Sequence, residues 1–148
     1  LKLKNLEYTT ITEEHAAAII GPKNPLYSRK LGGVSIDMLK DYPYVVYFDD
    51  NYNFNFEWSA LGLDRPYNYI QVSDRASMND FISQTDAFTV GIHNMNAYQN
   101  TAYYTNVKAL PLLGQELTFE LGWIKHKSHP LSAIAEEFVN ELEETLCN

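Results

Sequence analysis

Four side chains that could bind a ligand lie close together in the sequence: Ser73, Asp74, Arg75 and Ser77. The residues before them alternate between apolar and polar, as a strand requires, and those after them have the spacing of an amphipathic helix. Free backbone N–H groups and the helix dipole would favour an anionic or carboxylate ligand at such a helix start. A purely structural interpretation is equally open, with a capping box between Ser77 and Asp80 and an ion pair between Asp74 and Arg75.

Two further groups of candidate residues belong to predicted strands. Residues 44–48 are β-branched or aromatic and predict one strand, and alternation at residues 88–92 predicts another. The side chains that could contact a ligand there are Tyr47, Asp49 and Asn51 in the first group, and Thr89, Gly91 and His93 in the second. In open α/β sheets, ligands bind outside the carboxyl ends of the strands, where all these residues fall. The alternatives are a solvated acidic loop after residue 48 and a glycine that relieves a crowded bend.

The sequence carries no pattern typical of a catalytic or metal centre. It has no G-x-S-x-G nucleophile motif and no glycine-rich phosphate loop. His126 and His129 have an H-x-x-H spacing, but no second ligand pair completes a zinc site with Cys147. We therefore predict no catalytic residues, no metal and no cofactor. A small cytosolic enzyme that uses Asp74 or His93 as acid and base is a minor alternative.

Composition and charge narrow the function classes. The 148 residues carry a formal net charge of −8 and one cysteine. No basic stripe that could neutralise phosphates is visible, which argues against DNA binding by this chain alone. A single cysteine excludes an internal disulfide, and no apolar run approaches about 18 residues, so we expect a soluble cytoplasmic protein. The sequence starts without Met and without a signal peptide, as expected for a fragment of a longer cytoplasmic protein.

Apolar periodicity predicts alternating strands and helices, and hence an α/β fold with a mixed or parallel sheet. Strands are predicted at residues 1–11, 15–21, 44–48, 69–72, 88–92, 107–112 and 117–125. Helices are predicted after Ser35, from residue 77 with Met78, Phe81 and Ile82 on one face, at 95–102 and at 130–146. A further helix is predicted at 57–63, although the alternation of Phe54, Phe56 and Trp58 leaves a strand open there. The helix after residue 77 should connect two adjacent parallel strands, and residues 22–33, with their prolines and glycines, should form a loop.

Several stretches, in this order, resemble the regulatory part of LysR-type transcriptional regulators. The first is GPKNPLYSRKLGGVSIDMLKDYPYVVY, with a strand, a Pro-Leu turn, a helix start and a Tyr-Pro before the next strand. VSDRASM and TDAFTVG are similar to a subgroup pattern of that family, and LTFELGWIKHKSHPLSAIAEEFVNELEE resembles its last strand and last helix. The resemblance extends from residue 6 to residue 146.

The resemblance implies an effector-binding domain with a type 2 periplasmic-binding-protein-like fold of two α/β subdomains. Subdomain two would span residues 22–106, and an incomplete subdomain one would comprise residues 1–21 and 107–148. A small-molecule effector would bind in the cleft between the subdomains. DNA would be bound only through a helix-turn-helix domain absent from this chain. Regulatory domains of the family pair side by side, which implies a homodimer or homotetramer.

The sequence departs from the family pattern at two places. Asn24-Pro25-Leu26 stands where the family has a His-Pro-Leu turn, and Ile92-His93 replaces a small-residue pair beside the presumed cleft, so the identity of the ligand is not carried over. A type 2 solute-binding protein of a transporter shares the architecture and is the main alternative. An incomplete subdomain one should leave the apolar strand at residues 15–21 exposed, so we expect the chain to self-associate.

Overall fold

The computed structural model describes residues 4–47, 68–92 and 106–147. Its contacts divide the chain into two compact units. The hairpin unit comprises residues 1–14 and 118–148, and the sheet unit comprises residues 15–117. Strand β1, Leu6–Ile20, contributes its first half to the hairpin unit and its second half to the sheet unit.

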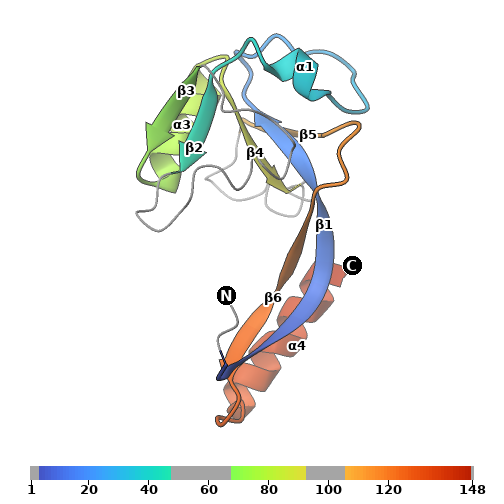
Figure 1. The fold of residues 1–148 in the computed structure, drawn as a ribbon, viewed down its shortest axis with the longest axis vertical. Coiled ribbons are helices and arrows are strands. Elements are labelled where there is room, and N and C mark those ends of the chain that lie inside the picture. The colour runs from blue at the N-terminus through green and yellow to red at the C-terminus, as the bar shows by residue number, and fades with distance from the viewer. Residues whose placement is uncertain (1–3, 48–67, 93–105, 148) are drawn as a thin grey trace. The chain divides into compact units, whose positions relative to one another are not determined.

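The sheet unit is built on a mixed sheet with the strand order β3-β2-β4-β1-β5 (Figure 1). Its strands besides β1 are β2 (Tyr44–Tyr47), β3 (Tyr69–Val72), β4 (Phe88–Ile92) and β5 (Lys108–Pro111). β2 is parallel to β3 and β4, whereas β1 is antiparallel to β4 and β5. These strands and the mixed α/β sheet confirm the prediction from the sequence.

The predicted adjacency of β3 and β4 is wrong, because β2 lies between them. Both strands are parallel to β2, so the helix that connects them must cross over β2. The central place suits β2: Tyr44, Val45 and Val46 are all buried, as in a strand that is covered on both faces. Tyr44 also packs on Phe88 of β4, with the ring centroids 5.3 Å apart.

Helix α3, Arg75–Gln84, packs on β2 and β3 through the spacing of its apolar residues. Met78 and Ile82 stand one turn apart and are both buried. They share one apolar cluster with residues of the strands and their ends: Val45, Val72 and Ala87. Phe81 was predicted on the same face, but it is 40% exposed, because it projects at the edge of this narrow buried stripe.

Asn24, in the loop at residues 22–33, is a buried polar side chain that ties the loop to the end of α3. It is 1% exposed. Its Nδ2 donates a hydrogen bond to the carbonyl of Asp86, and its Oδ1 accepts one from the backbone N–H of Leu26 at 2.9 Å. Lys108 Nζ of β5 donates to the carbonyl of Arg29 at 3.2 Å in the same loop. The loop expected from the sequence is thus bound to the turn after α3 through Asn24 and to β5 through Lys108.

The second half of β1 is buried, which corrects the prediction of an exposed strand at residues 15–21. Ala16, Ala17, Ala18, Ile19 and Ile20 are each at most 4% exposed. The reason is that β4 and β5 pair with β1 on both of its edges. The apolar surface that the sequence led us to expect on this strand is therefore not available for self-association.

Helix α1, Ile36–Leu39, begins after Ser35, as predicted, but the Ser35 side chain forms no capping hydrogen bond. Leu39 anchors this short helix in the core. The helices predicted at residues 57–63 and 95–102 lie outside the described residues.

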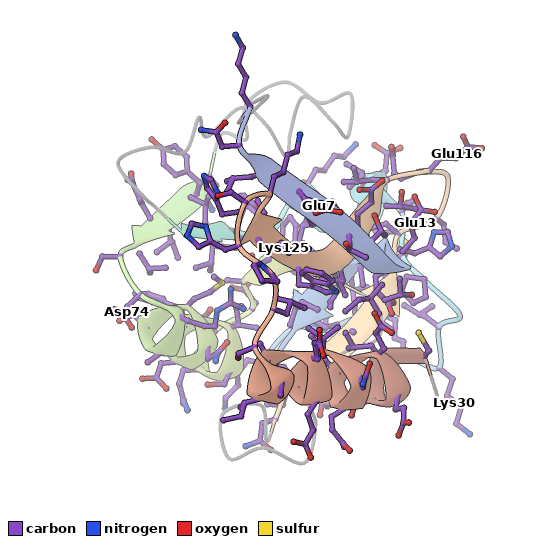
Figure 2. All side chains as sticks on the ribbon, turned by 90° about the horizontal axis from the view of Figure 1, so that it is seen from below. Glu7, Glu13, Lys30, Asp74, Glu116 and Lys125 are labelled. Atoms are coloured by element: carbon purple, nitrogen blue, oxygen red, sulfur yellow. The ribbon has the colours of Figure 1, made fainter. Side chains whose placement is uncertain are left out.

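The hairpin unit consists of the first half of β1, strand β6 (Thr118–His126) and helix α4 (Ala133–Cys147). Both β6 and α4 were predicted, although α4 begins three residues after the expected start. β6 pairs with β1, and a Cβ atom at Gly122 would overlap the carbonyl of Thr9, so the strands are in close contact there. Lys125 Nζ lies 3.4 Å from Glu7 Oε2 across the pair, and Figure 2 shows the two side chains on these strands.

Candidate functional site

Parallel pairing brings the ends of three strands to one edge of the sheet unit. Val72 at the end of β3 is paired with Tyr47 at the end of β2, and the start of β2 is in register with the start of β4. The carboxyl ends of β3, β2 and β4 therefore lie along the same edge, as the sequence predicted. We call this edge the strand-end rim; its described residues are Tyr47, Ser73, Asp74, Arg75, Ser77 and Gly91.

Asp74 is the N-cap of α3, and this corrects the predicted capping box between Ser77 and Asp80. The backbone N–H of Ser77 donates to Asp74 Oδ1 at 2.8 Å, and the Ser77 hydroxyl donates to Oδ2 at 2.7 Å. Asp74 has the extended backbone (φ −146°, ψ 159°) that an N-cap requires, whereas Ser77 is already inside the helix. The cap thus lies three residues earlier than the sequence pattern indicated.

The hydrogen bonds from Ser77 also set the charge state of Asp74. The backbone N–H of Ser77 is the largest cause of a lowered Asp74 pKa, followed by the Ser77 hydroxyl, with desolvation opposing them weakly. Asp74 is therefore a carboxylate at neutral pH, and Figure 2 shows it at the start of α3. Because this carboxylate already occupies the helix N-terminus, it would repel a highly charged anion there.

The other rim residues around α3 are accessible. Ser73 and Arg75 are exposed, and Ser77 is half-buried. The hydroxyl of Ser73, the carboxylate of Asp74 and the guanidinium of Arg75 are consecutive in sequence and all exposed. Their predicted contact with a ligand is compatible with this exposure. Such a group can bind a small polar molecule both as a hydrogen-bond donor and as an acceptor.

Two candidates on β4 are also engaged in packing. Thr89 is 8% exposed and pairs with Ile19 of β1. A Cβ atom at Gly91 would lie 3.3 Å from Cγ1 of Ile19, so this glycine leaves room for the Ile19 side chain. The local structure thus gives the crowded-bend interpretation of Gly91 a concrete cause, and its approach by a ligand stays a prediction.

The remaining site predictions fall on residues that the structure does not describe. Asp49, Asn51 and His93 lie outside the described ranges, and for Tyr47 only the backbone position at the end of β2 is given. Asn24 was noted in the sequence only as a departure from a family turn, and its burial was missed. The Asn-Pro step was the available signal, because Asn side chains often hydrogen-bond to the backbone two residues on.

The Ser128 hydroxyl lies within hydrogen-bond distance of both His126, the last residue of β6, and His129 in the turn that follows. Ser128 Oγ lies 2.7 Å from His126 Nδ1 and 3.2 Å from His129 Nδ1, and the two rings are edge-on at 5.0 Å. Within residues 4–47, 68–92 and 106–147, no three His, Cys, Asp or Glu side chains are grouped as metal ligands would be. In the same ranges no helix has the length and apolar character needed to cross a membrane.

No family model matches this sequence, and no curated protein matches it. Solved structures do match. HinK, a LysR family transcriptional regulator from Pseudomonas aeruginosa, has a TM-score of 0.71 at 15% identity, over 97% of this chain and 49% of HinK. The BenM effector binding domain with its effector benzoate has a TM-score of 0.70 at 15% identity, over 99% of this chain and 67% of that one. The effector binding domain of QuiR in complex with shikimate has a TM-score of 0.64 at 15% identity, over 96% and 65%.

The fold is that of a LysR-type effector-binding domain. It is thus the type 2 periplasmic-binding-protein-like α/β fold that the sequence resemblance implied. This chain spans about half the length of HinK and of full-length BenM E226K. Since identity to these LysR-type structures is only 15%, the match establishes the fold alone.

Proposed function

We propose that this chain is the ligand-sensing regulatory domain of a LysR-type DNA-binding transcription regulator, with a small-molecule effector bound at the strand-end rim. The observation that carries the proposal is the shared fold over nearly the whole chain with effector-binding domains, two of which contain benzoate and shikimate. On this proposal the chain binds its ligand without converting it. It acts in the cytoplasm, where a regulator meets its operator.

The rim charges favour a small, weakly charged effector. Arg75 is the basic side chain of the group around α3, and the Asp74 carboxylate next to it opposes any highly charged anion. Ser73 and Ser77 add hydroxyl groups for hydrogen bonding. A neutral or singly charged molecule with polar substituents suits this set, and a polyanion does not.

The wider effector site in this proposal includes the rest of the predicted residues: Tyr47, Asp49, Asn51, Thr89, Gly91 and His93. The regulatory subdomains are proposed at residues 1–21 with 107–148 and at residues 22–106. Effector binding would change the populations of two states of the regulator, and the helix-turn-helix domain that binds DNA would respond to that change.

Calorimetric titration of the 148-residue chain with benzoate and with shikimate, followed by a panel of small hydroxylated monocarboxylates, tests the effector site. We expect one panel member to bind, and Arg75→Ala and Ser73→Ala each to weaken it by about 10-fold or more, which is typical for loss of a polar ligand contact. Lys40→Ala is the matched control, because Lys40 is an exposed cation on a different element, where it pairs with Asp37. Binding that is equally strong in both rim variants would place the site elsewhere.

A mobility-shift assay tests whether this chain alone binds DNA. At a net charge of −8, the chain should give no sequence-specific shift with operator-length duplexes at about 0.15 M salt. A specific complex formed by this chain alone would contradict the proposal that DNA contact belongs to another domain.

A further inference from the structure

The turn between β6 and α4 brings two histidine rings to one hydroxyl group. His126 is the last residue of β6, and His129 lies three residues later, in the turn. Ser128 Oγ lies 2.7 Å from Nδ1 of His126 and 3.2 Å from Nδ1 of His129, so the same nitrogen of each ring is directed at a common point. The backbone N–H of His129 donates to the carbonyl of His126 at 3.0 Å, and this bond closes the turn.

The two rings have the spacing of imidazoles that share one metal ion. Their centroids are 5.0 Å apart, at an interplanar angle of 70°. Imidazole nitrogens bind Zn²⁺ at about 2.0–2.1 Å, so two rings on one ion at a tetrahedral angle have centroids about 5 Å apart. The rings therefore need little movement to hold an ion, apart from rotation of the Ser128 side chain away from the common point.

His126 presents its Nδ1 in the form that a metal ion requires. The backbone N–H of Ser128 donates to this nitrogen at 3.3 Å, so the nitrogen carries a lone pair and no proton. Metal ions bind histidine only through such a deprotonated nitrogen. Because the bond from the Ser128 N–H is long, little hydrogen-bond energy is lost when an ion takes its place.

The charges around the turn set how tightly a cation can bind. Lys127 stands between the histidines in the sequence, but it is exposed, so solvent screens much of its repulsion. Lys125 of β6 lies 3.4 Å from Glu7, whose carboxylate offsets its charge. The net charge of −8 on the whole chain favours cations over anions at longer range. These charges allow a site of modest affinity.

We propose that this turn binds one divalent transition-metal ion through Nδ1 of His126 and Nδ1 of His129, with water completing the coordination. Imidazole ligands suit Zn²⁺, Ni²⁺ and Cu²⁺, of which Cu²⁺ should bind most tightly. The sequence predicted no metal, because no second ligand pair completes a site with Cys147. The structure gives the reason that Cys147 is not a ligand: it ends α4, whose 15 residues span about 22 Å from the turn. The inference does not depend on the proposed effector.

Isothermal titration calorimetry of the full chain with NiCl₂, and separately with ZnCl₂, tests this site. We expect one ion at the turn with a dissociation constant on the order of 10 µM, because two imidazoles are half the ligands of a structural zinc site. His126→Ala and His129→Ala should each weaken binding by about 10-fold or more, since one imidazole remains. His129 is exposed in a turn, so its substitution leaves the chain folded, which circular dichroism verifies.

Three variants are matched controls. His15→Ala removes an exposed histidine of β1, and Cys147→Ser removes the exposed thiol at the end of α4. Lys127→Ala changes the same turn, but it removes a neighbouring positive charge and no ligand. We expect none of the three to weaken the binding of either ion.

Proton NMR locates the bound ion, because Ni²⁺ is paramagnetic. Substoichiometric NiCl₂ should broaden the ring signals of His126 and His129 and leave those of His15 sharp. A chain that binds neither ion at about 1 mM overturns the proposal, as does binding that both His126→Ala and His129→Ala retain. Broadening that spares these two rings and affects other histidines overturns it as well.

Discussion

The side-chain amide of Asn24 donates a hydrogen bond to the carbonyl of Asp86, joining the loop after β1 to the turn between α3 and β4. The two residues are 62 positions apart in the sequence. Asn24 also accepts the N–H of Leu26, so one buried side chain satisfies a donor and an acceptor of the backbone. This pair of hydrogen bonds holds the start of the loop against the turn after α3, and it explains why a polar residue is buried there.

Asn24→Leu should destabilise the fold by about 2–3 kcal/mol, because it keeps the approximate volume but leaves the Asp86 carbonyl and the Leu26 N–H without their partner. Urea unfolding followed by circular dichroism measures this change. The exposed Gln84→Ala is the control and should alter the free energy of unfolding by about 0.5 kcal/mol or less. A neutral Asn24→Leu would mean that these bonds do not contribute to stability.

Gly21→Ala should destabilise the fold by about 2 kcal/mol or more, because the new methyl group would overlap the carbonyl of Ile82, and backbone atoms cannot move aside cheaply. Gly32→Ala is a close control, since no atom lies within 4 Å of its Cβ position. Both variants can be compared by the same urea unfolding. Equal stabilities for the two would show that α3 can shift to accept the methyl group.

Asp74→Asn should remove a pH-dependent part of the stability. The Asp74 pKa is lower in the folded chain than in the unfolded one, chiefly through the N–H of Ser77. Its stabilisation is therefore complete above the unfolded pKa, near about pH 4, and is lost as the pH falls through the lower folded value. Asn still caps helices, so the melting temperature should fall by only about 1–4 °C at pH 7.

The same variant gives a discriminating pH series. Melting temperatures measured from pH 7 down to about pH 2.5 should show the difference between wild type and Asp74→Asn shrinking at acid pH. Asp37→Asn, on α1, serves as the control carboxylate. A difference that stays constant across the series would contradict the role of the Asp74 charge.

Gly91→Ala separates the two interpretations of Gly91. The added methyl group would lie 3.3 Å from the Ile19 side chain, which can adjust, so we expect a loss of about 1 kcal/mol or less. A loss of this size leaves the chain folded. If an effector approaches the backbone at Gly91, its affinity for the folded variant should nevertheless fall in calorimetric titration. Unchanged affinity would assign Gly91 to packing alone.

Elements that depend on short-range sequence patterns were predicted well. The alternation in β6 and the helical spacing in α4 depend on neighbours in the chain, and both elements formed where expected. The position of β2 between β3 and β4 was not predictable in this way, because periodicity contains no information on strand order. The α3 cap was misplaced because Asp74 and Ser77 both suit an N-cap, and only the backbone angles distinguish them.

The sequence predicted where the strand-end rim lies, but it could not predict which rim side chains are buried by packing. Parallel pairing of β2 with β3 and β4 places the strand ends together whatever their side chains are. The burial of Thr89 and of residues 16–20 depends on β1 pairing with β4, which is a contact between segments far apart in the sequence. Local patterns could not show that contact, and for this reason the predicted exposure of β1 was wrong.

Strand β1 serves both units without a break, and this limits how the chain can change length during evolution. Inserting or deleting one residue within Leu6–Ile20 would turn every later side chain of the strand to the opposite face. Placed early in β1, such a change would disturb the pairing with β6 in one unit or with β4 and β5 in the other. Related sequences should therefore vary in length within residues 22–33 and keep a constant length along β1.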